Sequence, residues 1–185
     1  MDLQHGLARP RPRGRPAAAT REQVLDAARR RFLEGERVDV RAIAAELGLG
    51  RATIYRWFGS REQLVGEVLM AEAESLFRVA RTRARGRGAE RLLDTFDRIN
   101  RALAASVPLR TFLEAERDTA LRIITSSAGP VQPRAVAAVA LLIEEEVVKS
   151  GYQPPVEPAT LAYAIVRLAE AFIYNDAVVG IRGDV

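Results

Sequence analysis

Residues 40–59, VRAIAAELGLGRATIYRWFG, constrain the fold more than any other part of the chain. Apolar residues recur at helical spacing on both sides of a Gly-Leu-Gly segment that is long enough only for a tight turn. Gly48 stands where the first helix has to end, a position at which a left-handed backbone is common and a Cβ is penalised. Ile43, Leu47 and Ile54 have the spacing to share one core. The stretch therefore predicts a helix-turn-helix, with an ordinary helical hairpin as the alternative.

The second helix of this motif carries an outward face suited to DNA. Arg51 stands at its start, where side chains and backbone N–H groups meet DNA first. Once Ile54 and Phe58 turn into the core, the helical period places the remaining side chains outward or on the flanks. These residues are Ala52, Thr53, Tyr55, Arg56 and Trp57.

Charge is unevenly distributed along the chain. Residues 1–61 hold 13 arginines against 7 acidic residues, whereas the whole chain of 185 residues has a formal net charge of only +4. A basic first third joined to a nearly neutral remainder favours a nucleic-acid-binding module attached to a different kind of domain. Within it, PRGRP at residues 12–16 has the form of an AT-hook core, in which Arg13 and Arg15 would enter the minor groove. The alternative is a non-specific phosphate tether.

Helical patterns cover most of the chain, and no convincing strand pattern appears, so an all-α fold is expected. Thr20 with Gln23 and Ser60 with Gln63 have the spacing of helix-starting caps. The predicted helical segments are 20–35, 39–48, 51–58, 60–85, 89–106, 109–127, 131–150 and 158–180.

Several classes of protein are excluded or disfavoured by what the sequence lacks. There is no cysteine, and the single histidine is His5, near the start of the chain. Disulfides and thiolate metal sites are therefore excluded. No catalytic grouping is evident, so neither an enzyme, a cofactor nor a metal ion is expected. No segment reaches the length of a membrane span, and no signal peptide is recognisable, which predicts a soluble cytoplasmic protein without membrane contact.

Residues 39–69, DVRAIAAELGLGRATIYRWFGSREQLVGEVL, resemble the DNA-binding signature of the TetR-type transcriptional regulators. The resemblance implies an N-terminal three-helix DNA-binding domain followed by a helical domain for ligand binding and dimerisation. The corresponding division is an arm at residues 1–19, a DNA-binding domain at 20–65 and an effector and dimerisation domain at 66–185.

The resemblance also implies individual DNA contacts. Asp39 matches the cap of the second helix and keeps only that role, because its charge opposes a phosphate. Arg51 is able to donate two hydrogen bonds to guanine, and the hydroxyl of Tyr55 is expected at a phosphate. Arg61 matches a clamp on the DNA backbone. The matching positions are Arg41, Arg51, Ala52, Thr53, Tyr55, Arg56, Trp57 and Arg61, with partial core packing as the alternative for Tyr55 and Trp57.

The last two predicted helices, 131–150 and 158–180, are apolar over more than one face. In the family that the chain resembles, such helices pair with those of a second copy, which implies a homodimer. Glu144 to Glu146 are expected on a solvated face or at the rim of that interface.

A small-molecule site is expected in the C-terminal part, because an apolar cavity with a few fixed polar groups is the usual form of such a site. The alternative is structural ion pairing, for instance of Arg167 with Glu116 or Glu170. The tail resembles that of QsdR-type regulators, which implies a lactone-type or acyl-type effector. The candidate ligand residues are Phe96, Asn100, Phe112, Glu116, Arg117, Tyr163, Arg167, Glu170 and Tyr174.

The sequence thus predicts a regulator, expected to be a repressor, that binds double-stranded DNA at a palindromic operator and is released by a small molecule. An architectural DNA-binding protein without an effector site remains an alternative. A small helical enzyme is a further, less favoured one.

Overall fold

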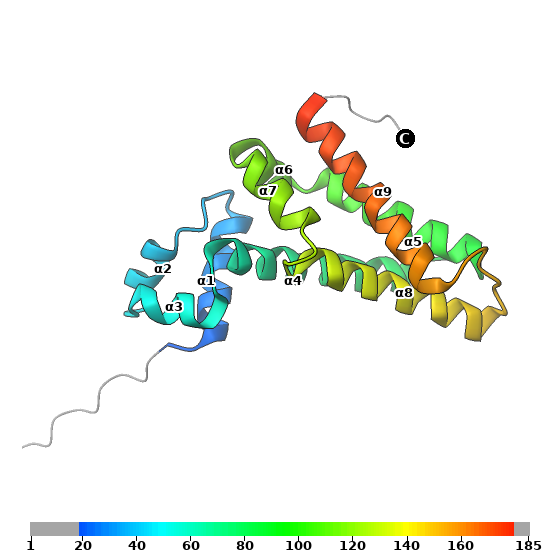
Figure 1. Cartoon of the computed structure of the whole chain (residues 1–185), viewed down its shortest axis with the longest axis horizontal. Helices are drawn as coiled ribbons and strands as arrows, with labels where there is room; N and C mark the ends of the chain where they lie inside the picture. Colours follow the sequence, from blue (N-terminus) through cyan, green and yellow to red (C-terminus); the bar gives the residue numbers. More distant parts are fainter. Residues whose placement is uncertain (1–18, 180–185) are drawn as a thin grey trace, which may run out of the picture.

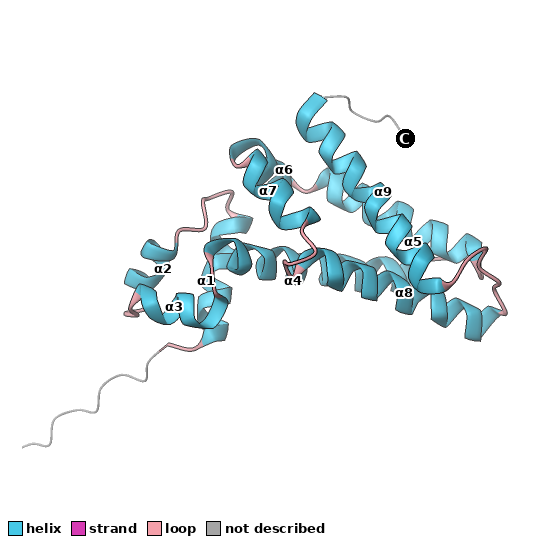
Figure 2. Ribbon diagram, viewed as in Figure 1, coloured by secondary structure: helices cyan, strands magenta, loops and turns pink. Residues whose placement is uncertain are grey.

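The computed structural model describes residues 19–179, with side chains described as far as residue 172. This part of the chain consists of helices joined by loops, without a strand (Figure 2), and the all-α prediction is confirmed. The helices are α1 Arg21–Leu33, α2 Val40–Glu46, α3 Arg51–Phe58, α4 Arg61–Arg83, α5 Ala89–Ala105, α6 Val107–Ala115, α7 Arg117–Thr125, α8 Val131–Ser150 and α9 Pro158–Val179.

The first three helices gather at one end of the molecule, and α5, α8 and α9 form the other end (Figure 1). The long helix α4 begins among the first group and reaches into the second. The short helices α6 and α7 pack between them, with α6 against α1 and α7 against α4, α8 and α9. Helix α4 is therefore the element that connects the two ends.

The predicted helix starts are confirmed by side-chain caps. The hydroxyl of Thr20 accepts the backbone N–H of Gln23, and the side chain of Gln23 accepts the N–H of Thr20. Asp39 accepts two backbone N–H groups at the start of α2, and Ser60 accepts that of Gln63 at the start of α4. These bonds satisfy N–H groups that a helix cannot pair internally. Local residues alone therefore determine where α1, α2 and α4 begin.

One predicted helix was wrong: residues 109–127 form two helices, not one. Helix α6 starts earlier, after the Ser106 cap, and the break falls at Glu116, whose backbone angles of φ −135° and ψ 44° are not helical. The carboxylate of Glu116 is bound there by Arg61, 55 residues earlier in the chain. The spacing of apolar residues did not reveal the break. The contact that coincides with the break joins residues far apart in the chain, and local spacing carries no information about such a contact.

Two hydrophobic cores hold the helices together. The first joins α1–α4 to α6 and α7 and includes Ile43, Ile54 and Phe112. The second lies at the far end, among α5, α8 and α9, and includes the fully buried Ile143. Both α4 and the first core continue past residue 65, the predicted boundary between the domains, which stays a prediction.

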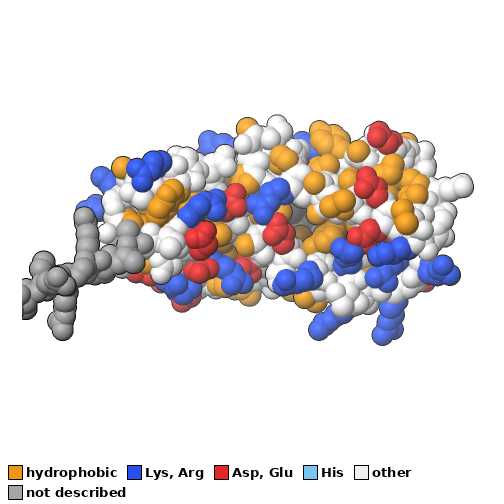
Figure 3. Space-filling view, turned by 90° about the horizontal axis from the view of Figure 1, so that it is seen from below, with side chains coloured by type: hydrophobic (Ala, Val, Ile, Leu, Met, Phe, Trp, Pro, Cys, Tyr) orange, Lys and Arg blue, Asp and Glu red, His pale blue; other side chains and the backbone are white. Residues whose placement is uncertain are grey.

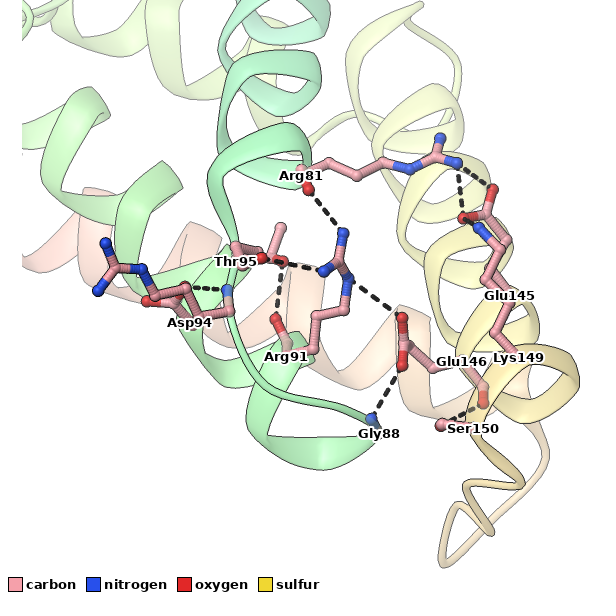
Figure 4. Close-up of polar contacts among 11 residues, drawn as sticks. Arg81, Gly88, Arg91, Asp94, Thr95, Glu145, Glu146, Lys149 and Ser150 are labelled. Atoms are coloured by element: carbon pink, nitrogen blue, oxygen red, sulfur yellow. Dashed lines mark hydrogen bonds and ion pairs between the residues drawn. The ribbon is translucent and has the colours of Figure 1, made fainter.

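A polar network closes the far end, where α4 passes into α5 and meets α8 (Figure 4). Glu146 on α8 is 4% exposed, and its carboxylate accepts the backbone N–H of Gly88 at 2.8 Å and lies 3.2 Å from Nε of Arg91. Arg91 also donates to the carbonyls of Ala84 and Arg81, both at 2.9 Å. A buried carboxylate therefore fixes the turn between α4 and α5.

The expectation of a solvated acidic face at Glu144 to Glu146 is thereby corrected. Glu144 alone among the three is exposed. Glu145 is paired with Arg81 and Lys149, and Glu146 is buried in the network. The reason is the helical period, which turns consecutive side chains by about 100° and so points neighbours in different directions.

Candidate DNA-binding surface and effector cavity

Helix α3 is held in place by its inner face. Ile54 of α3 and Ile43 of α2 are fully buried, and Leu47 and Leu49 pack against the same core. Gly48 adopts φ +65° between the two helices, which is the left-handed backbone expected from the sequence. No heavy atom lies within 4 Å of the place where its Cβ would be, so the conformation, not crowding, requires glycine there. The helix-turn-helix is thus formed as predicted.

The outward face of α3 has the predicted orientation. Arg51, Ala52, Tyr55 and Arg56 are exposed, and Thr53 and Trp57 are half-buried on the flanks. Trp57 also packs against the first core, as its alternative role required. The orientation of these side chains is confirmed, whereas their contacts with DNA stay a prediction.

Three arginines near this face keep their side chains available for an anion. Arg41, Arg51 and Arg56 are exposed, and within residues 19–172 their side chains form no ion pair or hydrogen bond. Asp39 accepts the backbone N–H of Arg41, which lowers the pKa of this carboxyl. It therefore stays charged as a cap, while the neighbouring surface is positive. Arg13 and Arg15 lie outside the described residues.

Arg61, expected to contact the DNA backbone, has an internal partner instead. Its Nη1 and Nη2 donate to the two carboxylate oxygens of Glu116 at 2.7 and 2.6 Å, and its Nε donates to the carbonyl of Val38 at 2.7 Å. The two side chains are only 15% and 14% exposed. The Arg61–Glu116 pair thus ties the loop before α2 and the start of α4 to the junction of α6 and α7.

A cavity of about 1020 Å³ lies in the C-terminal part, between α4, α5, α8 and α9, and most of its wall is apolar. Of the predicted ligand residues, Phe96, Asn100 and Glu170 line it. Figure 3 shows one face of the molecule, on which hydrophobic side chains gather between groups of Lys and Arg side chains. Apolar walls with few polar groups are what a small-molecule site requires.

The other predicted ligand residues are not among those that line the cavity. Phe112 is buried in the first core, where its ring packs edge-on against Phe32 at 6.1 Å. Glu116 is held by Arg61, and Arg117 and Tyr163 are exposed elsewhere on the surface. Phe112 and Glu116 line a separate, smaller cavity of about 280 Å³, and the ligand roles of these residues stay predictions. The side chain of Tyr174 lies outside the described residues.

Arg167 forms an ion pair with Glu170, which was the alternative to a ligand-binding role for these residues. Its Nη1 donates to Oε2 of Glu170 at 2.7 Å. Glu116 is not its partner. Glu170 is 6% exposed, and burial raises the pKa of its carboxyl, with Arg167 opposing the shift. Its other oxygen, Oε1, is buried and has no hydrogen-bond partner among the described residues.

Sequence reasoning missed several residues of the cavity wall. Met70 and Phe77 come from α4, on which no ligand residue was predicted. Gln132, a polar residue buried near the start of α8, also lines the cavity, and no pattern in the sequence singled it out.

The described residues contain no cluster of carboxylate or imidazole groups placed to hold a metal ion. None of the described helices combines the length and the apolar character needed to cross a membrane.

Comparison with known proteins relates both parts of the chain to one group of regulators. Residues 87–185 match the family model described as tetracyclin repressor-like, C-terminal domain, and residues 24–68 match that of bacterial regulatory proteins, tetR family. Among solved structures, the chain is similar to that of the R. erythropolis transcriptional repressor QsdR, a member of the TetR family. The two share 30% sequence identity with a TM-score of 0.81, over 85% of this chain and 84% of that chain. No curated protein matches.

Proposed function

Since the chain belongs to the TetR family and is a DNA-binding transcriptional regulator, we propose that it is a homodimeric repressor released from a palindromic operator by a small molecule. The observation that carries the proposal is that one long helix, α4, contacts both the DNA-binding end and the apolar cavity. Helix α4 begins three residues after α3 ends and packs against it, and its later turns line the apolar cavity. We keep residues 20–65 and 66–185 as the two functional regions of the proposal.

The proposed DNA contacts are those whose side chains are exposed around α3. Arg51 at the helix start reads a base edge, and Tyr55 and Arg41 contact the backbone or bases nearby. Ala52, Thr53, Arg56 and Trp57 complete the surface. Arg13 and Arg15 are proposed to add minor-groove contacts. Arg61 is left out of this set, because its guanidinium is bound to Glu116.

The proposed dimer forms through α8 and α9. Exposed apolar side chains on these helices, Leu141, Val148, Leu168 and Phe172, support this, since a second copy would remove them from water. A two-fold axis would then present two copies of α3 to successive turns of a palindromic site.

The proposed release requires an effector that binds more tightly to the conformation in which the two copies of α3 no longer match the operator. A tenfold loss of operator affinity needs about 1.4 kcal/mol of coupling. Contacts between α4, α7 and the Arg61–Glu116 pair connect the cavity to the DNA-binding end. Coupling is reciprocal, so the operator must weaken effector binding by the same factor.

Footprinting of the full chain on the DNA upstream of its own coding sequence tests the proposal. We expect one discrete palindrome to be protected. Arg51→Ala should cost about 1–3 kcal/mol of operator affinity and relax the preference at one position. The matched control is Arg83→Ala, an exposed arginine at the end of α4, which should leave affinity unchanged.

Two results would contradict the proposal. Protection without a discrete site would indicate an architectural DNA-binding protein instead. Unchanged relative affinities of Arg51→Ala for the operator and its point mutants would show that Arg51 makes no base contact.

A chain lacking residues 1–18 should lose more operator affinity on A/T-rich flanks than on G/C-rich ones, because the narrow minor groove of A-tracts attracts arginine. An equal loss on both would leave the arm as a phosphate tether.

A further inference from the structure

Arg21 is a cation held against the far end of α3. It is the first residue of α1, and its Cζ lies 4.4 Å from the ring centroid of Phe58, the last residue of α3. A guanidinium stacked on an aromatic ring is attracted by the face of the ring and keeps the N–H groups at its edge for other acceptors. The contact therefore positions the charge without using its hydrogen-bond donors.

These donors have no acceptor within the part of the chain that the structure describes. Arg21 is exposed, and its guanidinium forms no ion pair or hydrogen bond with residues 19–172. The neighbouring carboxylate of Glu22 is exposed as well and does not pair with it. Arg61 differs, because Glu116 binds both of its terminal nitrogens. An arginine with free donors thus lies beside α3, whereas the one that the family resemblance placed at the DNA is bound inside the protein.

The length of α3 brings this charge near the backbone of a bound duplex. Arg51 at the start of α3 and Phe58 at its end are separated by about 10 Å along the helix axis, at about 1.5 Å per residue. The major groove is about 12 Å wide, so a point within it lies within about 6 Å of one of the two rows of phosphates that border it. When the start of α3 reads base edges, its far end, with Arg21 beside it, lies near such a row.

The position of the start of α1 agrees with a contact of this kind. The start of α1 and the end of α3 lie side by side at the same end of the molecule (Figure 1). Arg15 precedes Arg21 by six residues, and an extended chain of that length spans about 20 Å at most. A row of phosphates separates a major groove from the minor groove next to it. A chain that runs from α3 into that minor groove therefore crosses a row of phosphates close to Arg21.

We propose that Arg21 binds a phosphate of duplex DNA beside the far end of α3 and takes the role of backbone clamp that the family resemblance assigned to Arg61. Such a contact positions the protein on DNA without reading sequence. The inference rests on the proposed DNA-binding surface around α3 and adds to it a contact from α1. Arg51 and Arg21 then bind DNA at the two ends of α3, the first at a base edge and the second at the backbone.

The salt dependence of DNA binding tests the proposal, because each phosphate contact releases counterions. Fluorescence anisotropy measures the affinity of the full chain for a mixed-sequence duplex, about three helical turns long, between about 50 and 200 mM salt. Arg21→Gln should lower the slope of log affinity against log salt by about one unit for each chain bound. Arg21→Lys should keep the slope, because its ammonium displaces the same counterions. The matched control is Arg83→Gln, which removes an exposed arginine at the end of α4 and should also keep the slope.

Ethylation interference on the operator that the footprint identifies locates the contact, because ethylation removes the charge of a single phosphate. In each half-site the wild type should be sensitive at a phosphate between the major groove and the neighbouring minor groove. Arg21→Gln should lose the sensitivity at that phosphate and keep it at the others. If the Arg21–Phe58 contact only stabilised the fold, the variant would bind more weakly with an unchanged pattern of phosphates, and the proposal would be wrong.

An unchanged salt slope in Arg21→Gln would overturn the proposal. An equal fall in Arg83→Gln would also overturn it, because the slope would then follow net charge and not one contact. A fall in Arg21→Lys as large as that in Arg21→Gln would contradict a phosphate contact, since the lysine keeps the charge. The mixed-sequence duplex requires no palindrome. Failure to find a discrete operator would therefore contradict the proposed repressor, while the salt slopes would still decide the role of Arg21.

Discussion

Replacing Glu116 with alanine removes the carboxylate that holds Arg61 at the junction of α6 and α7. The wild-type pair makes two hydrogen bonds of 2.6 and 2.7 Å, and both side chains are about six-sevenths buried, at 15% and 14% exposed. Arg61 would keep only the carbonyl of Val38 as a partner. Arg37, whose Nε lies 3.6 Å from the same carboxylate, would lose its counter-charge as well.

The expected cost lies between two limits. Breaking a fully buried ion pair costs about 3–5 kcal/mol, and an exposed pair is worth about 0–1 kcal/mol. With the exposure nearer the buried limit, we expect Glu116→Ala to lower the free energy of unfolding by about 2–4 kcal/mol. The double variant Arg61→Met with Glu116→Leu should lose less than the sum of the single changes, because no charge is left buried alone.

Urea denaturation of the wild type and the variants gives these free energies. The control is Asp97→Ala, which removes the exposed pair with Arg101 on α5 and should cost at most about 0.5 kcal/mol. Operator affinity measured at several salt concentrations separates the two roles of Arg61. If it acts through Glu116, Arg61→Ala and Glu116→Ala should both leave the salt slope unchanged.

A loss below about 0.5 kcal/mol for Glu116→Ala would refute the reasoning from burial, because the pair would then behave as an exposed one. A salt slope reduced by about one unit in Arg61→Ala, but not in Glu116→Ala, would show that Arg61 contacts a phosphate, as the family resemblance implied.

Two further predictions concern packing and pH. Gly66→Ala in α4 should destabilise the protein by about 1–2 kcal/mol despite its better helix propensity, because the new Cβ would lie 2.6 Å from Cγ of Pro130. Gly129→Ala in the same junction, with neighbours no nearer than 3.5 Å, is its control in thermal unfolding, and equal effects of the two would contradict the crowding. Because burial raises the pKa of Glu170, the folded state holds its proton to higher pH than the unfolded state, so this group lowers stability as pH rises above the ordinary glutamate pKa. Glu170→Gln should therefore gain stability relative to the wild type as pH rises, and a difference independent of pH in denaturation curves would contradict the raised pKa.

Much of the DNA-binding end was predictable because its determinants are neighbours in the chain. A cap such as Thr20 or Asp39 bonds to residues two or three positions later, and Gly48 acts through its own φ. The helical period then decided that Ile54 points inward and Tyr55 outward. The sequence by itself thus determined the helix-turn-helix, its exposed face and the all-α class.

The tertiary structure alone decided what depends on distant partners. The break at Glu116 coincides with its contact with Arg61, 55 residues away, and the buried Glu146 accepts the backbone N–H of Gly88, 58 residues away. The cavity wall combines side chains from helices throughout the chain, and it includes Glu170 of α9 but not Tyr163 of the same helix. The helical period of a sequence predicts that one face of a helix is buried. Which residues of that face meet a cavity, a core or an ion pair depends on the neighbouring helices, whose positions the period does not give.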